Sequence, residues 1–320
     1  MSPNPIRLLL HTECDDFDAL FSQVRHWQID LKKIDRGPFQ GFVFQLGIGQ
    51  VLLGGGGAST TMSMNGGSPS GMRSFLISAP LNQRFRWCSQ SLTGKEVAVM
   101  PGNLDFQATL SPGVRNFTYA FSDEHLAKIA DSMGLPGPDD LFRDQNVFHC
   151  DERSIVSIAS ELTKISDVVK RSPESMDVSH VHHMLNHELP RLLLEQLARD
   201  RPVRVTLSGS KQARALRLSE AFLHEATPEE LTVDDLLGVT EVSQRTLQYA
   251  FLKAYGVTPK AFLLSLRLNG AYRELLVTNP SRTKVSEVAN AWEFWHMGQF
   301  AADYKKLFGE LPSETLLKKG

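Results

Sequence analysis

The 320-residue sequence has few cysteines and no long apolar run. Its three cysteines, Cys14, Cys88 and Cys150, are widely spaced, so they cannot all pair and they lack the spacing of metal ligands. Such usage is typical of a reducing compartment. The apolar run Ile6–Leu10 is too short for a signal-peptide core or a membrane span. We therefore expect a cytoplasmic protein without a membrane segment.

A charge excess of one sign is absent as well. The formal net charge is −2 and the isoelectric point is about 6.6, so overall charge does not indicate a nucleic-acid partner and the local distribution has to decide. With 42% hydrophobic and 22% charged residues, the composition is that of a soluble globular protein. A chain of this length is expected to form two domains.

Histidine is missing between His26 and His125, in the part of the chain that reads as strands. Short apolar runs separated by glycine and proline turn signals predict a β-barrel or sandwich there. The predicted strands are Phe42–Phe44, Gln50–Leu53, Ser74–Ile77, Glu96–Met100 and Asn116–Phe121. A cupin-type enzyme with a helical appendage is the alternative function, and it would need a metal-binding histidine cluster on these strands. We therefore expect no enzyme, no catalytic residue and no cofactor.

The strand region also offers ligand-binding interpretations. The run Gly54–Gly57 resembles a phosphate loop, but it lacks the Lys-Ser/Thr pair and a following helix, which favours a flexible hairpin end. A barrel of this size is able to enclose a small effector, whose binding residues the sequence leaves unknown. The candidate lining residues, each more readily explained as structural, are Arg73, Arg86, Trp87 and Phe106.

Residues from about 123 to 200 have helical periodicity. Ser122 before Asp123-Glu124 predicts the N-cap of a helix that ends at Gly134. Two longer amphipathic patterns follow, at about 155–165 and at Val178–Arg199, and their apolar seam suggests a homodimer contact.

Histidines gather on the second of these helices. His180, His183 and His187 would share one face at a zinc-like spacing. Because no cysteine or fourth ligand lies nearby, a histidine-rich solvated or interface face is the favoured interpretation, and we expect no metal. The stretch Arg201–Ser210 reads as a linker, which divides the chain into residues 1–205 and 206–320. The first domain would be β-rich to about residue 122 and helical from about 123 to 200.

Beyond the linker one pattern occurs twice, at an offset of 53 residues. Tyr255-Gly256 aligns with Phe308-Gly309, and Pro259 aligns with Pro312. Each copy reads as an amphipathic helix, a short turn and a second helix that ends at glycine. This predicts two helix-turn-helix motifs, at about 231–252 and about 283–306.

A predicted helix joins the two motifs. Thr258-Pro259 opens it and it runs to about Leu276, a length of about 30 Å. Successive major grooves on one DNA face recur about every 34 Å. A rigid connection of this length would set the two second helices in adjacent grooves.

Polar and basic side chains mark the outer face of the first motif. Ser243 predicts the N-cap of its second helix, after a turn at Val239–Val242. The side chains expected to face outward are Gln244, Arg245, Gln248 and Tyr249, and Arg and Gln can make paired hydrogen bonds to base edges. From Ser243 to Lys284 the single acid Glu274 stands against Arg245, Lys253, Lys260, Arg267, Arg273, Arg282 and Lys284. Such a concentration indicates an anionic partner.

The second motif has a poorer reading face. His296 and Gln299 are its outward groups, and Lys305 and Lys306 further along suit phosphate contacts. Gly298 stands where the first copy has Arg245 and supplies no side chain. We expect the first motif to carry more of the sequence reading.

Three segments resemble the signature of AraC-type (AraC/XylS) transcription regulators. They are Gly256–Leu263, Arg267-Leu268 and Phe308–Ser313. The resemblance covers about residues 211–317 and implies a seven-helix domain that binds double-stranded DNA, with RNA polymerase as a further partner. It also implies that the first domain is a cupin-like sensor and dimerisation module. Glu293-Phe294 departs from the family, which usually has Gly before Phe at this turn.

The expected fold is therefore α+β, with an N-terminal β-rich cupin-like barrel carrying helices and a C-terminal all-α domain. The expected function is a sequence-specific transcription regulator, an activator, controlled by a small-molecule effector bound in residues 1–205. A module whose helices bind another protein is the third alternative, and the basic stretch argues against it.

Overall fold

The structure is a computed structural model that describes most of residues 7–320. The residues not described are 1–6, 17–18, 21–23, 25, 80–83, 89, 101–104, 144–145, 172–177, 200–210, 227–230 and 319–320. The chain forms two compact units. The first comprises Met1–Asp30, Gln40–Ala58 and Met64–Val205. The second comprises Leu31–Phe39, Ser59–Ser63 and Thr206–Gly320.

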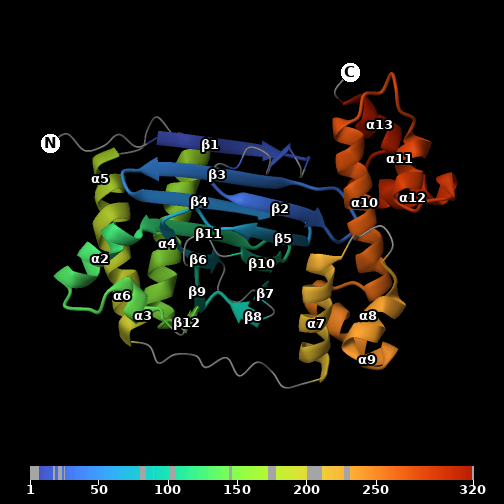
Figure 1. The fold of residues 1–320 in the computed structure, drawn as a ribbon. Coiled ribbons are helices and arrows are strands. Elements are labelled where there is room, and N and C mark those ends of the chain that lie inside the picture. The colour runs from blue at the N-terminus through green and yellow to red at the C-terminus, as the bar shows by residue number, and fades with distance from the viewer. Residues whose placement is uncertain are drawn as a thin grey trace. The chain divides into compact units, whose positions relative to one another are not determined.

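The strands form two sheets (Figure 1). The seven-stranded sheet has the order β1 (Arg7–Cys14), β3 (Gly41–Ile48), β4 (Val51–Ala58), β11 (Arg115–Ser122), β6 (Met72–Ala79), β9 (Glu96–Met100), β12 (Val147–His149). The five-stranded sheet has the order β2 (Gln28–Lys33), β5 (Met62–Gly67), β10 (Asp105–Leu110), β7 (Arg84–Trp87), β8 (Gln90–Thr93). The predicted strands fall within observed ones except at Gln50, which lies in the turn before β4. No pairing among the described strands closes the sheets into one barrel, so the cupin-like barrel stays a prediction.

Helices cover one face of the seven-stranded sheet. They are α2 (Asp123–Ser132), α3 (Pro138–Leu141), α4 (Glu152–Arg171), α5 (Val178–His183), the π-helix η2 (Met184–Glu188) and α6 (Leu189–Arg199). Alternate β11 residues such as Phe117 and Phe121 share a buried cluster with Leu162 and Leu193 of these helices. The inward side chains of the strand, which recur every second residue, thus pack in one core with the apolar faces of the helices.

The glycine run is part of a strand, so the prediction of a flexible hairpin end at Gly54–Gly57 was wrong. These residues lie in β4, hydrogen-bonded to β3 on one side and β11 on the other. A Cβ on Gly55 would come within 2.4 Å of the Phe44 ring, and one on Gly54 within 2.7 Å of the Thr118 hydroxyl. Glycine is needed here because large neighbouring side chains cross over the strand.

The C-terminal part of the second unit is helical. Its described helices are α7 (Lys211–Glu225), α8 (Val233–Thr240), α9 (Gln244–Tyr255), α10 (Pro259–Val277), α11 (Val285–Ala291), α12 (Met297–Phe308) and α13 (Pro312–Leu317). The helix α10 begins at the predicted Thr258-Pro259, where the Thr258 hydroxyl accepts from the Ala261 N–H at 3.3 Å. No described helix has the length and apolar composition needed to cross a bilayer.

Two groups of helices pack at the two ends of α10, with α7–α9 at one end and α11–α13 at the other (Figure 1). Phe262 near its start packs with Phe251 of α9 at 5.4 Å between ring centroids. Tyr272 near its end packs with Phe308 of α12 at 4.6 Å. The joining helix is thus part of the core of both motifs.

Candidate nucleic-acid interface

The first motif consists of α8, a tight turn and α9. A capping box starts α8: Thr232 accepts from the Asp235 N–H at 3.3 Å, and the Asp235 carboxylate accepts from the Thr232 N–H at 2.9 Å. Hydrogen bonds from Thr232 lower the pKa of the Asp235 carboxyl. The helix continues through Thr240, whose hydroxyl is buried and donates to the Leu236 carbonyl at 2.6 Å. The predicted turn at Val239 therefore began too early.

The turn itself places Glu241 in the left-handed region, with φ of 53°. Ser243 then caps α9 as predicted, because its hydroxyl accepts from the Thr246 N–H at 3.3 Å. The left-handed Glu241 that ends α8 and the Ser243 cap that starts α9 together fix the direction in which α9 leaves α8.

The helix α9 has one buried face and one exposed face. Leu247, Ala250 and Phe251 are buried in the motif's core. The predicted reading residues are all exposed, namely Ser243, Gln244, Arg245, Gln248 and Tyr249. The Arg245 guanidinium lies 5.5 Å from the centroid of the Tyr249 ring and donates to its hydroxyl at 3.4 Å. This contact orients a cation on the exposed face.

The second motif, α11 and α12, has a longer turn. Its left-handed residue is Glu293, with φ of 60°, which lies 52 positions after Glu241. The second helices start at Gln244 and Met297, 53 positions apart. The prediction of a constant offset of 53 was therefore wrong for the first helices and the turns. Glu293 adopts the conformation for which glycine is usual.

The predicted residues of the second motif are exposed too, but two of the four interact with the Asp303 carboxylate. His296, Gln299, Lys305 and Lys306 all lie at the surface. The Gln299 amide donates to Asp303 at 2.7 Å, and the Lys306 ammonium lies 3.6 Å from the same carboxylate. Two of the polar side chains on the surface of α12 are thus already engaged with an acid of the same helix.

Trp295 is a residue that the sequence analysis missed. Its side chain is 64% exposed, immediately before His296, and its indole N–H donates to Glu293 at 3.0 Å. An aromatic residue beside the buried Phe294 reads as core from sequence. Helix-turn-helix proteins contact base edges with the N-terminal residues of the second helix, and apolar side chains are able to contact thymine methyl groups.

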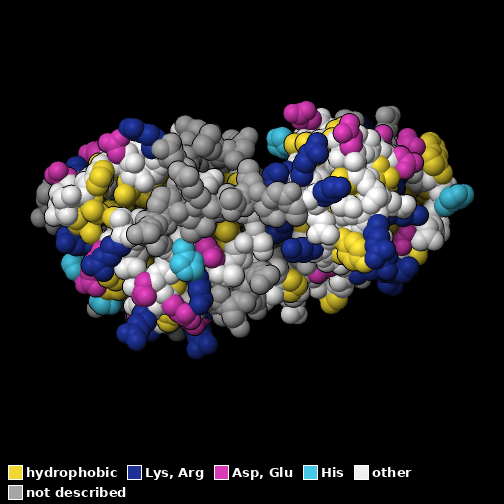
Figure 2. All heavy atoms as spheres, turned by 90° about the horizontal axis from the view of Figure 1, so that it is seen from below, with side chains coloured by type: hydrophobic (Ala, Val, Ile, Leu, Met, Phe, Trp, Pro, Cys, Tyr) yellow, Lys and Arg dark blue, Asp and Glu magenta, His cyan; other side chains and the backbone are white. Residues whose placement is uncertain are grey.

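The basic stretch divides into surface and structural residues. Figure 2 shows Lys and Arg side chains gathered on one face of the helical unit. Of the seven basic residues between Ser243 and Lys284, those that are exposed are Arg245, Lys253, Lys260, Arg282 and Lys284. Arg267 instead lies 5.2 Å from the Phe294 ring centroid, and burial lowers its pKa against the opposing effect of Glu293. Arg273 donates to the backbone carbonyl of Leu31.

Known proteins share this C-terminal region. The sequence model of a helix-turn-helix domain family matches residues 236–318. The probable thc operon regulatory protein of Rhodococcus erythropolis is 33% identical over 149 residues, 45% of this chain and 44% of that protein. A XylDLEGF operon transcriptional activator of Pseudomonas putida is 33% identical over 98 residues, 31% of this chain and 30% of that protein. A solved AraC family regulator from Rhodopseudomonas palustris is 35% identical over 32% of this chain and 94% of that chain, with a TM-score of 0.29.

The C-terminal domain belongs to the AraC-type helix-turn-helix family. The matches span less than half the length of each of the two curated relatives named above.

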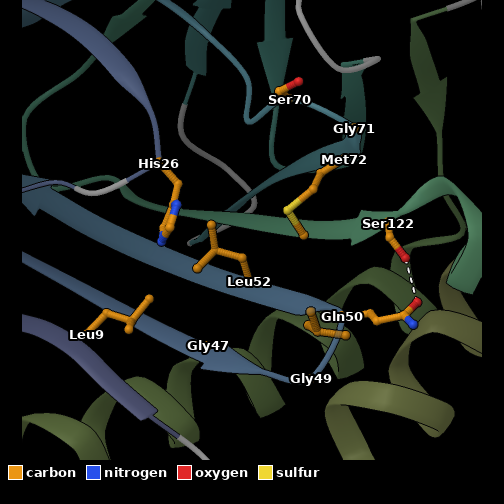
Figure 3. A pocket seen from close by; sticks show the side chains of 11 residues that line it. Leu9, His26, Gly47, Gly49, Gln50, Leu52, Ser70, Gly71, Met72 and Ser122 are labelled. Atoms are coloured by element: carbon orange, nitrogen blue, oxygen red, sulfur yellow. Dashed lines mark hydrogen bonds between the residues drawn. The ribbon is translucent and has the colours of Figure 1, made fainter.

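Outside the AraC-type domain, a cavity of about 600 Å³ lies in the first unit (Figure 3). It is lined by Leu9, His26, Gly47, Gly49, Gln50, Val51, Leu52, Ser70, Gly71, Met72 and Ser122. Its polar groups include the His26 ring and the Gln50 amide, whose oxygen accepts from the Ser122 hydroxyl at 2.6 Å. A small molecule with an apolar body and a few hydrogen-bonding groups suits this lining.

The four lining residues suggested from sequence do not line this cavity. Arg73 is buried and pairs with Asp123 at 3.0 Å and Asp139 at 2.8 Å. Trp87 and Phe106 are buried and stack on each other at 5.1 Å. Their structural interpretation fits these contacts better than ligand binding.

The histidine-rich helix is interrupted by η2, which changes the spacing of its side chains. The His183 and His187 rings lie 5.4 Å apart, and His183 is 3.1 Å from the Glu188 carboxylate. Burial and the neighbouring His183 and His182 lower the pKa of His187. Within the described residues no group of three or more His, Cys, Asp or Glu side chains is arranged to hold a metal ion.

Proposed function

We propose that the chain is a sequence-specific transcription activator, controlled by a small-molecule effector that binds within residues 1–205. The observation that carries the proposal is the pair of motifs packed at the two ends of α10. The 19 residues of α10 span about 28 Å, close to the distance of about 34 Å between successive major grooves. One chain is therefore able to reach two adjacent grooves.

In this proposal the first motif reads most of the sequence. Gln244 and Arg245, in the first turn of α9, reach base edges, and Gln248 and Tyr249 contact or flank bases one turn later. Ser243 holds the start of the helix and lies near the phosphates. The helix start is the part of a recognition helix that enters the groove.

The second motif probes the adjacent groove and fixes the register. His296 and Gln299 face bases, while Lys305 and Lys306 contact phosphates. Because Gln299 and Lys306 already interact with Asp303, this motif contributes less base discrimination than the first.

The proposed roles of residues 1–205 are effector sensing and dimerisation. The volume of the cavity beside His26 and Gln50 lies within the range of small-molecule sites, roughly 300 to 1,000 Å³. The names of the relatives, an operon regulatory protein and an operon activator, support the choice of an activator, which implies RNA polymerase as a partner. The apolar faces of α4 and α6 are buried in the core of the first unit, so the candidate contacts of a homodimer are the exposed side chains Val156 of α4 and Leu192 of α6.

A binding assay with Arg245→Ala tests the proposal. The duplex is one enriched from a random-sequence library by the wild-type protein, and affinity is measured by fluorescence anisotropy at fixed salt. We expect a loss of about 1 to 3 kcal/mol. Arg143→Ala is the matched control, since Arg143 is 70% exposed in the first unit and pairs with Asp140 three residues before it. An Arg245→Ala loss no larger than the control's would count against base reading by this residue.

A further inference from the structure

A buried asparagine on α10 holds a segment from the N-terminal part of the sequence. Asn269 is 1% exposed. Its Oδ1 accepts from the Lys33 N–H at 2.9 Å, and its Nδ2 donates to the Lys33 carbonyl at 2.8 Å. The second Nδ2 hydrogen goes to the Ser265 carbonyl at 2.6 Å. Both amide hydrogens are thus used, and Lys33 is held as a neighbouring strand would hold it.

The same segment, Leu31–Phe39, contacts each part of the AraC-type domain. One turn along α10, Arg273 donates to the Leu31 carbonyl. Ile34 is 3% exposed and belongs to the buried cluster of the first motif, with Leu247 and Phe251. These contacts lie within the second compact unit, which includes Leu31–Phe39.

The far end of the segment reaches the second motif. The Gly37 N–H donates to the Lys306 carbonyl at 3.1 Å. That carbonyl lies in the last turn of α12, where carbonyls lack a partner within the helix. A pocket of about 360 Å³ is lined by Ile34 and Arg36 of the segment, Leu252 of α9 and Leu307 of α12. The segment thus lies between the C-terminal halves of the two second helices.

We propose that Leu31–Phe39 is a structural part of the DNA-binding unit and sets the placement of one helix-turn-helix motif against the other. Asn269 is the positioning residue. The helix α10 fixes the distance between the motifs along its axis, while the segment ties the core of the first motif to the end of α12. The consequence is a fixed spacing between the two DNA half-sites. This inference rests on the proposed binding of two adjacent grooves.

The test uses the full chain and three DNA duplexes. The first is the duplex enriched by the wild-type protein, the second has one base pair inserted between its half-sites, and the third has one half-site scrambled. For Asn269→Ala we expect an affinity loss of about tenfold for the first duplex and a change below about twofold for the third, because linked sites lose avidity when their geometry is not fixed. The penalty for the inserted base pair should shrink in the variant.

Arg273→Met provides a second, milder variant should Asn269→Ala fail to fold by circular dichroism. It removes the donor to Leu31 from a partly exposed position, and we expect the same pattern at smaller size. Arg143→Met is the matched control, because Arg143 is 70% exposed in the first unit and pairs with Asp140.

Three results would overturn the inference. An unchanged spacing penalty in the folded variants would show that the segment does not set the spacing. Equal losses on all three duplexes would assign Asn269 and Arg273 to fold maintenance or general DNA contact. A wild-type protein that enriches no duplex at all would remove the proposed function, and with it this inference.

Discussion

Trp292 lies against Gly270 of α10, so closely that a Cβ on Gly270 would come within 2.0 Å of the indole Cη2. The same indole donates from Nε1 to Glu274 at 2.7 Å. The turn of the second motif thus rests on α10 at a position where only a glycine leaves room for the ring.

Gly270→Ala should destabilise the AraC-type domain by about 1 to 3 kcal/mol, because the added methyl group overpacks this contact. Gly298→Ala is the matched control. Gly298 is the second residue of α12, and a Cβ there meets nothing within 4 Å, so alanine should leave the stability unchanged or raise it by less than about 1 kcal/mol. Thermal unfolding followed by circular dichroism measures both. If both substitutions raise the melting temperature, the higher helix propensity of alanine outweighs any clash with Trp292, and the contact does not require glycine at position 270.

Glu241 and Glu293, the left-handed residues of the two turns, should respond differently to substitution by glycine. A non-glycine residue in the left-handed region costs about 1 to 2 kcal/mol. Glycine removes this cost, but it also increases the entropy of the unfolded chain, which cancels part of the stabilisation. We expect Glu241→Gly to raise the melting temperature. Glu293→Gly should raise it less, because the substitution also removes the acceptor of the Trp295 indole and the charge that opposes the lowered pKa of Arg267. A larger gain at Glu293 than at Glu241 would contradict this explanation.

Lys33 predicts a pH-dependent stability. Its side chain is fully buried, and burial lowers its pKa from 10.5 to about 8, against the opposing charge of Asp35. Between these two values the unfolded chain binds more protons than the folded chain, so stability rises with pH there. Below about 8 the buried charge costs up to about 3 kcal/mol, since one pKa unit corresponds to about 1.4 kcal/mol.

Lys33→Met should therefore raise the melting temperature at pH 7. Near pH 10.5 its advantage should be largely gone, because the wild-type amine is then neutral in the folded chain and half-neutral in the unfolded chain. Paired melting curves at the two pH values make the measurement. If Lys33→Met lowers the melting temperature equally at both pH values, burial of the protonated Lys33 side chain does not destabilise the folded chain.

Lys305→Ala tests phosphate anchoring by the second motif. We expect weaker binding to every duplex, with the slope of log affinity against log salt reduced by about 0.9, the release of about one counterion. Lys128→Ala is the control, since Lys128 on α2 is 66% exposed and pairs with Glu124. An unchanged slope for Lys305→Ala would remove this lysine from the phosphate contacts.

The starts of the helices could be predicted because their signals are local. The predicted starts at Ser122, Ser243 and Thr258 each accept from an N–H three residues further along the chain. The same applies to the short apolar runs that predicted β9 and β11. For the reading face of α9, the helical period of Leu247, Ala250 and Phe251 was enough to turn Arg245 and Gln248 outward.

The features that could not be predicted from the sequence are set by residues far away along the chain. The Gly54–Gly57 strand is required by Phe44 and Thr118, which lie on the neighbouring strands. Lys33 and Asn269 are 236 positions apart, and neither has a local signal for the other. The one-residue difference between the two turns was hidden because the second helices keep an offset of 53 while the left-handed residues do not.

Binding-site selection from a random-sequence duplex library tests most directly that the two motifs read adjacent major grooves. With wild-type protein we predict two enriched blocks whose centres lie about 10 base pairs apart. Selection with Arg245→Ala should keep both blocks and lose the preference at a base position within one of them. A single enriched block, or no enrichment, would contradict the account.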